Sequence, residues 1–144
     1  MQAKQLSVFI ENREGRLDEV LAVIAAAKVN ILSLSLADTS EYGLLRLIVS
    51  DPAKADAALR ANGFSSMLTD VLVVRLDNKV GSLQSFLAEI SKTEINLEYM
   101  YGLTIEKEGK ASLVIKASDL AKASSILLSS GAELLSAEDI AKLC

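Results

Sequence analysis

Two polar turns, each with a glycine, contain the residues that could bind a small anion. Apolar residues at helical spacing follow each turn, so each glycine is expected at a helix N-terminus, where backbone N–H groups lack a partner within the helix. These groups and the positive end of the helix dipole favour a carboxylate or a phosphate. A glycine between strand and helix also simply lets the chain turn, which leaves both interpretations open. The turns are Asn12, Arg13, Glu14, Gly15, Arg16 and Leu17, and Asn78, Lys79, Val80, Gly81, Ser82 and Leu83.

An asparagine stands where the strand after each of these helices is expected to begin. An amide side chain can both donate and accept hydrogen bonds, so each asparagine could complete the site at its turn. Asparagine is also a common turn residue, and its repetition does not settle its role. The two strand starts read Asn30, Ile31 and Leu32, and Asn96, Leu97, Glu98 and Tyr99.

The turns belong to an internal duplication. Between Glu11 and Ile31, seven of 21 positions are identical to the residue 66 positions later, whereas average residue usage gives roughly one or two by chance. A second block repeats at an offset of 68, from Ser50-Asp51 and Ser118-Asp119 as far as Gly63 and Gly131. The 144-residue chain is therefore one small module written twice, and we expect domains at 1–70 and 71–144.

Alternating and helical spacing predict the same order of elements in both halves. Pro52 after Ser50 or Asp51 marks the start of a helix that runs to Gly63, and residues 136–139 resemble a capping box before a short terminal helix. The fold class is α+β: two ferredoxin-like βαββαβ units, each with an antiparallel four-stranded sheet and helices on one face. Strands are expected at 5–11, 30–36, 44–50, 65–68, 71–76, 96–106, 111–117 and 133–135, hairpin turns at 37–43 and 106–109, and further helices after 15, at 81–92 and at 119–130.

Composition argues against several classes of function. The net charge is -4, the chain has no histidine, and its basic residues do not cluster, so nucleic acid and anionic lipid are not expected partners. The longest apolar run, Val20 to Ala27, is too short to span a membrane, and the N-terminus lacks a signal-peptide pattern. Cys144 is the single cysteine, so one chain offers neither a disulfide nor a thiolate metal site. We expect a cytoplasmic protein without a metal or a cofactor.

The sheet face opposite the helices is expected to lack a cover in each unit. Tyr99 and Tyr101 occupy this face in the second unit, where the first unit has Ser33 and Ser35. Aromatic residues on an uncovered sheet indicate a partner surface. Packing against the sister domain and contact with a second chain both agree with this pattern.

The repeated motif resembles the ACT domain, a βαββαβ module that senses small ligands in amino-acid metabolism. The resemblance rests on the turn from Asn12 to Leu17 followed by Val29-Asn30-Ile31, and on the second copy through Ile95-Asn96-Leu97. It covers roughly residues 4–135, which implies a stand-alone pair of ACT domains. In the family, amino acids bind where the first strand-to-helix loop of one domain meets the second strand of a neighbouring domain.

Carried over by residue, the resemblance assigns the loop asparagine, the loop glycine and the strand asparagine of each copy to the ligand. The backbone N–H groups between Arg13 and Arg16 are expected to bind the carboxylate, and asparagine carbonyls the ammonium. The family often has a proline before the glycine, whereas Glu14 and Val80 stand here and loosen the loop. The family's polar residue two positions before the loop asparagine is replaced by Ile10 or Leu76, so a serine-type site is not expected.

An enzyme is one alternative. A βαββαβ fold with Arg13 in the first loop and Asn30 on the next strand is similar to acylphosphatase, in which a loop arginine binds phosphate and an asparagine orients water. The longer phosphate loop of that enzyme is missing, Lys79 replaces the arginine in the second copy, and no histidine is available as a base. We therefore expect no catalysis.

Other modules with this fold fit less well, except for an adaptor. A metal-carrying module needs a Cys-x-x-Cys motif, and an RNA-binding sheet needs aromatic residues where the chain has Val8 and Ile48. An adaptor or regulatory subunit that binds a partner enzyme without a ligand of its own stays open. The favoured hypothesis is a non-catalytic homodimer that binds an amino-acid effector at the interfaces between ACT domains and signals through association, with a metabolic enzyme as a possible partner.

Overall fold

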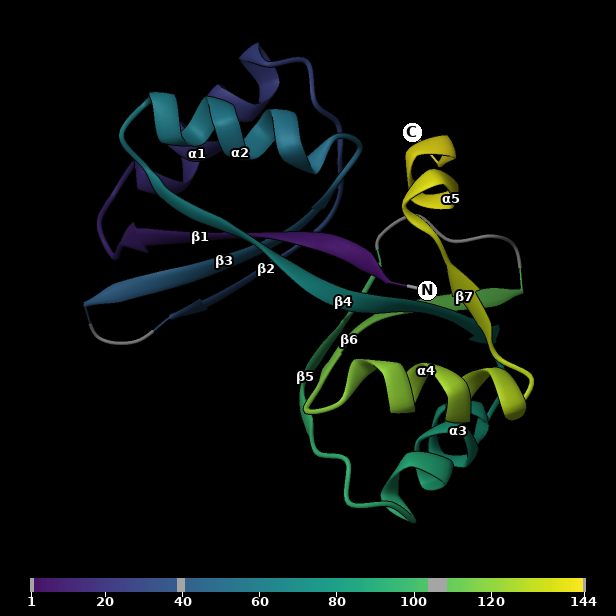
Figure 1. Cartoon of the computed structure of the whole chain (residues 1–144). Coiled ribbons are helices and arrows are strands. Elements are labelled where there is room, and N and C mark those ends of the chain that lie inside the picture. Colours follow the sequence, from purple (N-terminus) through teal and green to yellow (C-terminus); the bar gives the residue numbers. More distant parts are fainter. Residues whose placement is uncertain (1, 39–40, 104–108, 144) are drawn as a thin grey trace. The chain divides into compact units, whose positions relative to one another are not determined.

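The computed structural model describes residues 2–38, 41–103 and 109–143 (Figure 1). The chain divides into two compact units. The first unit is Lys4–Thr69 with Ile140–Cys144, and the second unit is Met1–Ala3 with Asp70–Asp139. Each unit corresponds to one copy of the duplicated module.

The first unit contains the predicted βαββαβ order. Its strands stand in the order β2-β3-β1-β4, and the registers of β1 with β3 and of β2 with β3 are antiparallel. Its helices α1 and α2 pack against one face of this sheet. The elements are β1 (Ala3–Glu11), α1 (Arg16–Ala26), β2 (Ile31–Asp38), β3 (Tyr42–Val49), α2 (Pro52–Ala61) and β4 (Ser65–Asp77).

The second unit repeats this order and shares β4 with the first. In it β6 pairs with β4 and with β5, and β7 pairs with the other edge of β4, all in antiparallel register. The predicted α+β class with two βαββαβ units is confirmed. The elements are α3 (Ser82–Ser91), β5 (Leu97–Gly102), β6 (Lys110–Ala117), α4 (Leu120–Ser129), β7 (Glu133–Leu135) and α5 (Ala137–Lys142).

One long strand replaces two predicted short ones. The sequence predicts separate strands at 65–68 and 71–76, whereas β4 runs without interruption from Ser65 to Asp77. This stretch contains neither glycine nor proline, and so it contains none of the residues that usually break a strand. The predicted strand at 96–106 is observed as far as Gly102, while residues 106–108 of its turn and 39–40 of the first hairpin lie outside the described residues.

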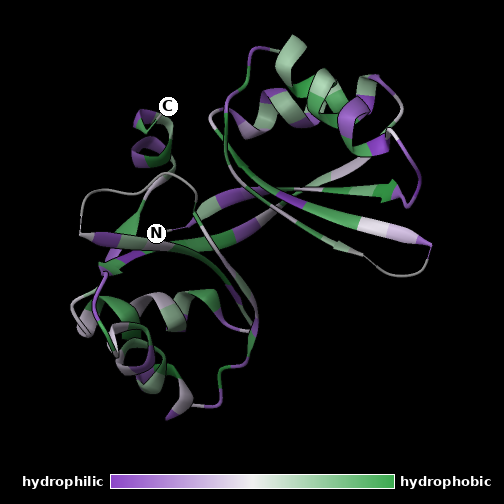
Figure 2. Cartoon of the chain, turned by 180° about the vertical axis from the view of Figure 1, so that it is seen from behind, coloured by the Kyte–Doolittle hydropathy of each residue, from purple (hydrophilic) through white to green (hydrophobic). Residues whose placement is uncertain are grey.

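The core of each unit lies between the helices and one face of the sheet. In the first unit Leu6, Val8 and Ile10 of β1 pack with Val20 and Ile24 of α1, as the alternation predicts. In the second unit the equivalent residues come from β4 and α3. Figure 2 shows hydrophobic and hydrophilic segments alternating along the helices of both units, as expected for helices with one buried side.

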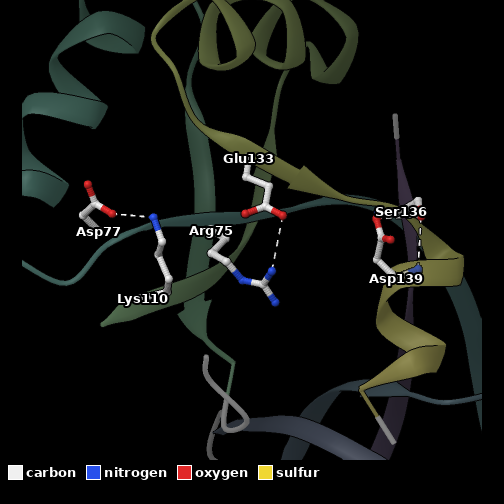
Figure 3. A network of polar contacts seen from close by, with 6 residues as sticks. All are labelled: Arg75, Asp77, Lys110, Glu133, Ser136 and Asp139. Carbon is white, nitrogen blue, oxygen red and sulfur yellow. Dashed lines mark hydrogen bonds and ion pairs between the residues drawn. The ribbon is translucent and has the colours of Figure 1, made fainter. Parts of the chain in front are cut away.

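Side-chain caps fix the starts of the later helices. Asp51 Oδ1 accepts a hydrogen bond from the Lys54 N–H (3.2 Å), so Asp51 rather than Ser50 caps α2. The predicted capping box before α5 is confirmed, because Ser136 N–H donates to Asp139 Oδ2 (2.8 Å) and Asp139 N–H donates to Ser136 Oγ (3.1 Å; Figure 3). In the described part of the chain, no helix has the length and apolar character that a membrane crossing requires.

Candidate functional site

The glycine of each turn lies in the left-handed region directly before a helix. Gly15 precedes α1 and Gly81 precedes α3, and both have φ of 81°. A Cβ at either position would meet no atom within 4 Å. The backbone conformation, rather than crowding, therefore favours glycine in both copies.

The first helix of each unit also begins without a side-chain cap. Neither Gly15 nor Gly81 can supply one, and no side chain in the described part of the chain accepts a hydrogen bond from the first N–H groups of α1 or α3. The second helices differ, because Asp51 caps α2 and Asp119 caps α4. In each unit, the helix that follows the glycine turn is thus the one with N–H groups open to an anion.

The second turn uses several of its own N–H groups. Asn78 donates to the Gly109 carbonyl (3.0 Å), Lys79 to Asp77 (3.0 Å) and Ser82 to Lys79 (3.1 Å). Among the described residues, the N–H groups of Val80 and Gly81, and those of Leu83 and Gln84 in the first turn of α3, have no acceptor. The donors left for an anion therefore lie on both sides of Ser82.

The first turn repeats these hydrogen bonds. Asn12 donates to the Glu41 carbonyl (3.0 Å), Arg13 to Glu11 (2.9 Å) and Arg16 to Arg13 (3.4 Å). The expected set of donors from Arg13 to Arg16 is thus reduced, within the described residues, to the N–H groups of Glu14 and Gly15. The side chain of Arg16 turns to other partners, because its guanidinium lies 4.5 Å from the centroid of the Phe64 ring.

A serine fixes the backbone of each strand asparagine. Asn30 N–H donates to Ser50 Oγ (2.9 Å), and the Asn30 carbonyl accepts from Ser50 N–H (2.9 Å). Asn96 makes the same pair of bonds with Ser118, at 3.0 and 2.9 Å. The serine therefore satisfies the backbone groups of each asparagine. The amide side chain of each asparagine is exposed and is available to a ligand.

A cavity of about 770 Å³ in the second unit joins the glycine turn to the asparagine. It lies along α3 and brings together five predicted residues. They are Lys79, Gly81, Leu83, Asn96 and Leu97. Of the described residues that line the cavity, Lys79 is the one with a charge, so its potential favours a group with negative charge.

The other predicted residues of the second copy lie outside this cavity. Asn78, Val80 and Glu98 are exposed, and Ser82 borders a different cavity. Tyr99 lies on the opposite face of the sheet, because it alternates with Met100, which packs in the core between sheet and helices. The predicted position of Tyr99 and Tyr101 on the face without helices is confirmed.

Sequence reasoning missed the side of α3 that forms the cavity wall. The helical spacing groups Leu83, Phe86, Leu87 and Ile90 as one apolar stripe. In the structure Phe86 and Ile90 are buried in the core, whereas Leu83 is 41% exposed and lines the cavity with Leu87. The four-residue spacing from Leu83 to Leu87 continues to Ser91, and this second row of side chains was a usable indication. The remaining wall residues are Gln84, Ala88, Ile90, Ser91 and Ile95.

Comparisons with known proteins agree with this fold. A crystal structure of a protein from Bacteroides thetaiotaomicron has 39% sequence identity and a TM-score of 0.92, over 99% of this chain and 97% of that chain. The regulatory subunit of aspartate kinase from Thermus thermophilus, in a ligand-free form, has the same fold at 16% identity and a TM-score of 0.65, over 89% and 90% of the two chains. The regulatory subunit of aspartate kinase from Thermus flavus has 18% identity and a TM-score of 0.61, over 91% of this chain and 94% of that chain. A comparison with curated protein sequences found no match.

A family model described as an ACT domain pair matches residues 1–144. The match extends over both units, from β1 to α5. The duplicated βαββαβ order of the structure is thus that of two such domains. The chain belongs to the ACT domain pair family.

Proposed function

We propose that this protein is a non-catalytic sensor that binds a small amino acid, with the α3 cavity of the second unit as its main binding site. The observation that carries the proposal is the cavity of about 770 Å³ that joins Gly81 to Asn96. It offers hydrogen-bond donors at one end and an amide at the other, with an apolar wall between them. This arrangement suits a zwitterion with a small side chain.

The carboxylate of the ligand is assigned to the turn. The N–H groups of Gly81 and Leu83 have no acceptor among the described residues, and they lie at the uncapped, positive end of α3. Lys79 adds a positive charge to the same end of the cavity. Charge-assisted hydrogen bonds to a carboxylate are about twice as strong as neutral ones.

The ammonium group is assigned to the amide oxygen of Asn96, whose backbone Ser118 holds in place. The ligand side chain then lies against Leu83 and Leu87. The first unit contains the equivalent turn and Asn30, and we assign it the second, weaker site. Its turn leaves the equivalent N–H groups without an acceptor among the described residues, but the guanidinium of its Arg16 is engaged by Glu19 and Phe64.

The signal passes through association with another protein. An ACT domain pair has the fold of the regulatory subunits of aspartate kinase from two Thermus species, which supports a regulatory role beside a metabolic enzyme. We propose a cytoplasmic homodimer as the working form. Ligand binding would shift the population towards the associated or the free state, depending on which state binds the ligand more tightly.

A thermal-shift screen of the twenty amino acids tests the binding. A ligand that binds the folded state at one hundred times its Kd stabilises that state by about 2.7 kcal/mol, which moves Tm by several degrees. We expect a response to one or a few small amino acids. The proposal fails if none of the twenty shifts Tm at millimolar concentration.

Asn96→Ala locates the site, with Asn30→Ala as its matched control. Both variants remove an exposed strand-start asparagine with the same backbone partners, so a general loss of stability affects both alike. We expect Asn96→Ala to weaken binding at least about tenfold, a loss of about 1.4 kcal/mol, and Asn30→Ala to change the main response little. Equal affinities for the parent and Asn96→Ala would place the ligand elsewhere.

A further inference from the structure

A stacked pair of side chains in the first unit, one buried and one half-buried, fills a place that the second unit leaves open. The Arg16 guanidinium lies 4.5 Å from the centre of the Phe64 ring, and Arg16 Nη1 pairs with Glu19 Oε2 at 2.6 Å. Phe64 is 8% exposed and belongs to the core. Together these residues join the start of α1 to the segment that follows α2.

The second unit has small residues at both positions. Ser82 corresponds to Arg16, because its N–H donates to the residue three positions earlier as that of Arg16 does. Ala132 corresponds to Phe64, since their N–H groups donate to the equivalent carbonyls of Leu127 and Leu59, at 3.1 and 3.0 Å. A guanidinium and an aromatic ring are thus replaced by a hydroxymethyl and a methyl group.

A cavity of about 970 Å³ lies at this place in the second unit, with Ser82 and Ala132 in its wall. Its other walls come from α3, from the C-terminal part of α4 and from the ends of β4 and β6. It is distinct from the cavity that joins Gly81 to Asn96, because the two cavities share no lining residue among those described. Figure 3 shows two ion pairs from its wall, Arg75 with Glu133 and Asp77 with Lys110.

The wall of this cavity is rich in hydrogen-bond acceptors. The hydroxyl groups of Ser125, Ser129 and Ser130 each donate to a carbonyl one turn earlier in α4, at 3.2, 2.9 and 2.9 Å. Their protons are therefore used, and their oxygen lone pairs can accept. These serines lie at the C-terminal end of α4, where the helix dipole is negative and favours a cation.

Three carboxylates line the cavity, each paired with a basic side chain of the same wall, and the pair of Glu89 is the one a guest can enter. Glu89 pairs with Lys92, whose side chain is 69% exposed, and exposed pairs of this kind contribute little to stability. The lysine can therefore turn into solvent when a second cation arrives. Phe86 also lines the cavity and supplies an aromatic ring, as Phe64 does for Arg16 in the first unit.

We propose that this cavity is a second ligand site, which takes the guanidinium or primary ammonium group of a small organic cation. In the first unit the chain's own Arg16 occupies the equivalent place. In the second unit a free molecule takes that role, between Ser129, Glu89 and Phe86. The site needs no carboxylate on its ligand, and so it does not depend on the amino-acid site at Gly81.

Agmatine is the probe, because it carries a guanidinium and an ammonium group but no carboxylate. Titration of the full chain by calorimetry should give saturable binding with a Kd at or below the millimolar range, while sodium chloride at equal ionic strength and the dianion succinate should give none. Absence of saturable binding of agmatine at about 20 mM, well above that range, overturns the proposal.

Two variants locate the probe. Ala132→Phe restores the first unit's ring and should reduce agmatine affinity at least about tenfold, by filling the cavity. Glu89→Gln removes one carboxylate at an exposed position and should reduce it about threefold or more. Glu138→Gln makes the same charge change outside the cavity and is the control. The proposal is wrong if both cavity variants, folded by circular dichroism, bind agmatine as the parent does, or if Glu138→Gln weakens binding as much as Glu89→Gln.

Discussion

The two units share a backbone design and differ in what fills the space beside their helices. In both, a glycine with φ of 81° begins the first helix, and a serine fixes the backbone of the strand asparagine. Beside the helices, the first unit stacks Arg16 on Phe64, whereas the second has Ser82, Ala132 and a cavity of about 970 Å³. The positions that fix the backbone are thus the same in both copies, while the side chains at the place of this cavity differ.

The two repeated sequence blocks have separate structural explanations. The block at Ser50 and Ser118 keeps a serine that binds the asparagine backbone, followed by an aspartate that caps the next helix. This dipeptide joins a strand start to a helix start through two side chains. Repetition of the block therefore reports a structural requirement, and it does not by itself indicate ligand binding.

The largest expected effect comes from Phe64→Ala, which gives the first unit the residue that the second unit has. Loss of a buried ring should lower the free energy of unfolding by about 3 kcal/mol, through lost transfer energy and the cavity left behind. Urea unfolding, monitored by circular dichroism, measures this loss of unfolding free energy.

Arg16→Ala is the companion variant. It should cost about 1 kcal/mol, because it removes one cation–π contact and one partly exposed ion pair but little of the core. A cost for Phe64→Ala no larger than that for Arg16→Ala would show that the ring does not fill the first unit, and the contrast between the units would be lost.

An intermediate effect is expected for Gly15→Ala and Gly81→Ala, which test the shared backbone design. Each places a Cβ on a residue with φ of 81°, and no atom lies within 4 Å, so the strain of the backbone alone should cost about 1 kcal/mol in each unit. Thermal unfolding measures both costs.

Gly102→Ala is the control for these variants, because its Cβ also meets nothing within 4 Å but its φ is not in the left-handed region. It should leave Tm nearly unchanged. The backbone strain has a lower limit of about 1 kcal/mol. If the losses of unfolding free energy in Gly15→Ala and Gly81→Ala differ by more than about this amount, the two turns are not equivalent.

The smallest effect is expected for Lys110→Gln. Lys110 forms an ion pair with Asp77 in the second unit, and the first unit has Tyr42 and Glu11 at the equivalent positions. The hydrogen bond from Lys110, together with its charge, lowers the pKa of Asp77 below the usual value of 3.8. A lowered pKa means that the pair stabilises the fold above about pH 3.8 and that this contribution is lost as the pH falls further, through the folded-state value.

In Lys110→Gln the pKa of Asp77 should rise towards its usual value, as followed by NMR titration of the carboxyl carbon. Stability at neutral pH should fall only slightly, because both side chains are exposed. An unchanged pKa of Asp77 in this variant would show that Lys79, the other nearby cation, is the main cause of the shift.

Much of the fold was predictable because the pattern of apolar residues is local. Leu6, Val8 and Ile10 alternate in the sequence and lie on the core face of β1, and Ser136 and Asp139 form the predicted capping box. The continuity of β4 was not predictable, because Thr69 and Asp70 are polar and read as a break between two domains. Whether polar residues stay extended depends on long-range strand pairing, which short-range patterns do not contain.

The sequence by itself determined that one βαββαβ module occurs twice, and it located the glycine turns and the strand asparagines. These features follow from local backbone preferences and from the spacing of apolar residues, which each short segment carries with it. Only the tertiary structure decided which residues face a cavity. It separated Leu83 from the core residues of the same helix, and it set Arg16 on Phe64 in one unit while leaving space beside Ser82 and Ala132 in the other. Such spaces depend on the volumes of side chains that are distant in sequence and adjacent only after folding.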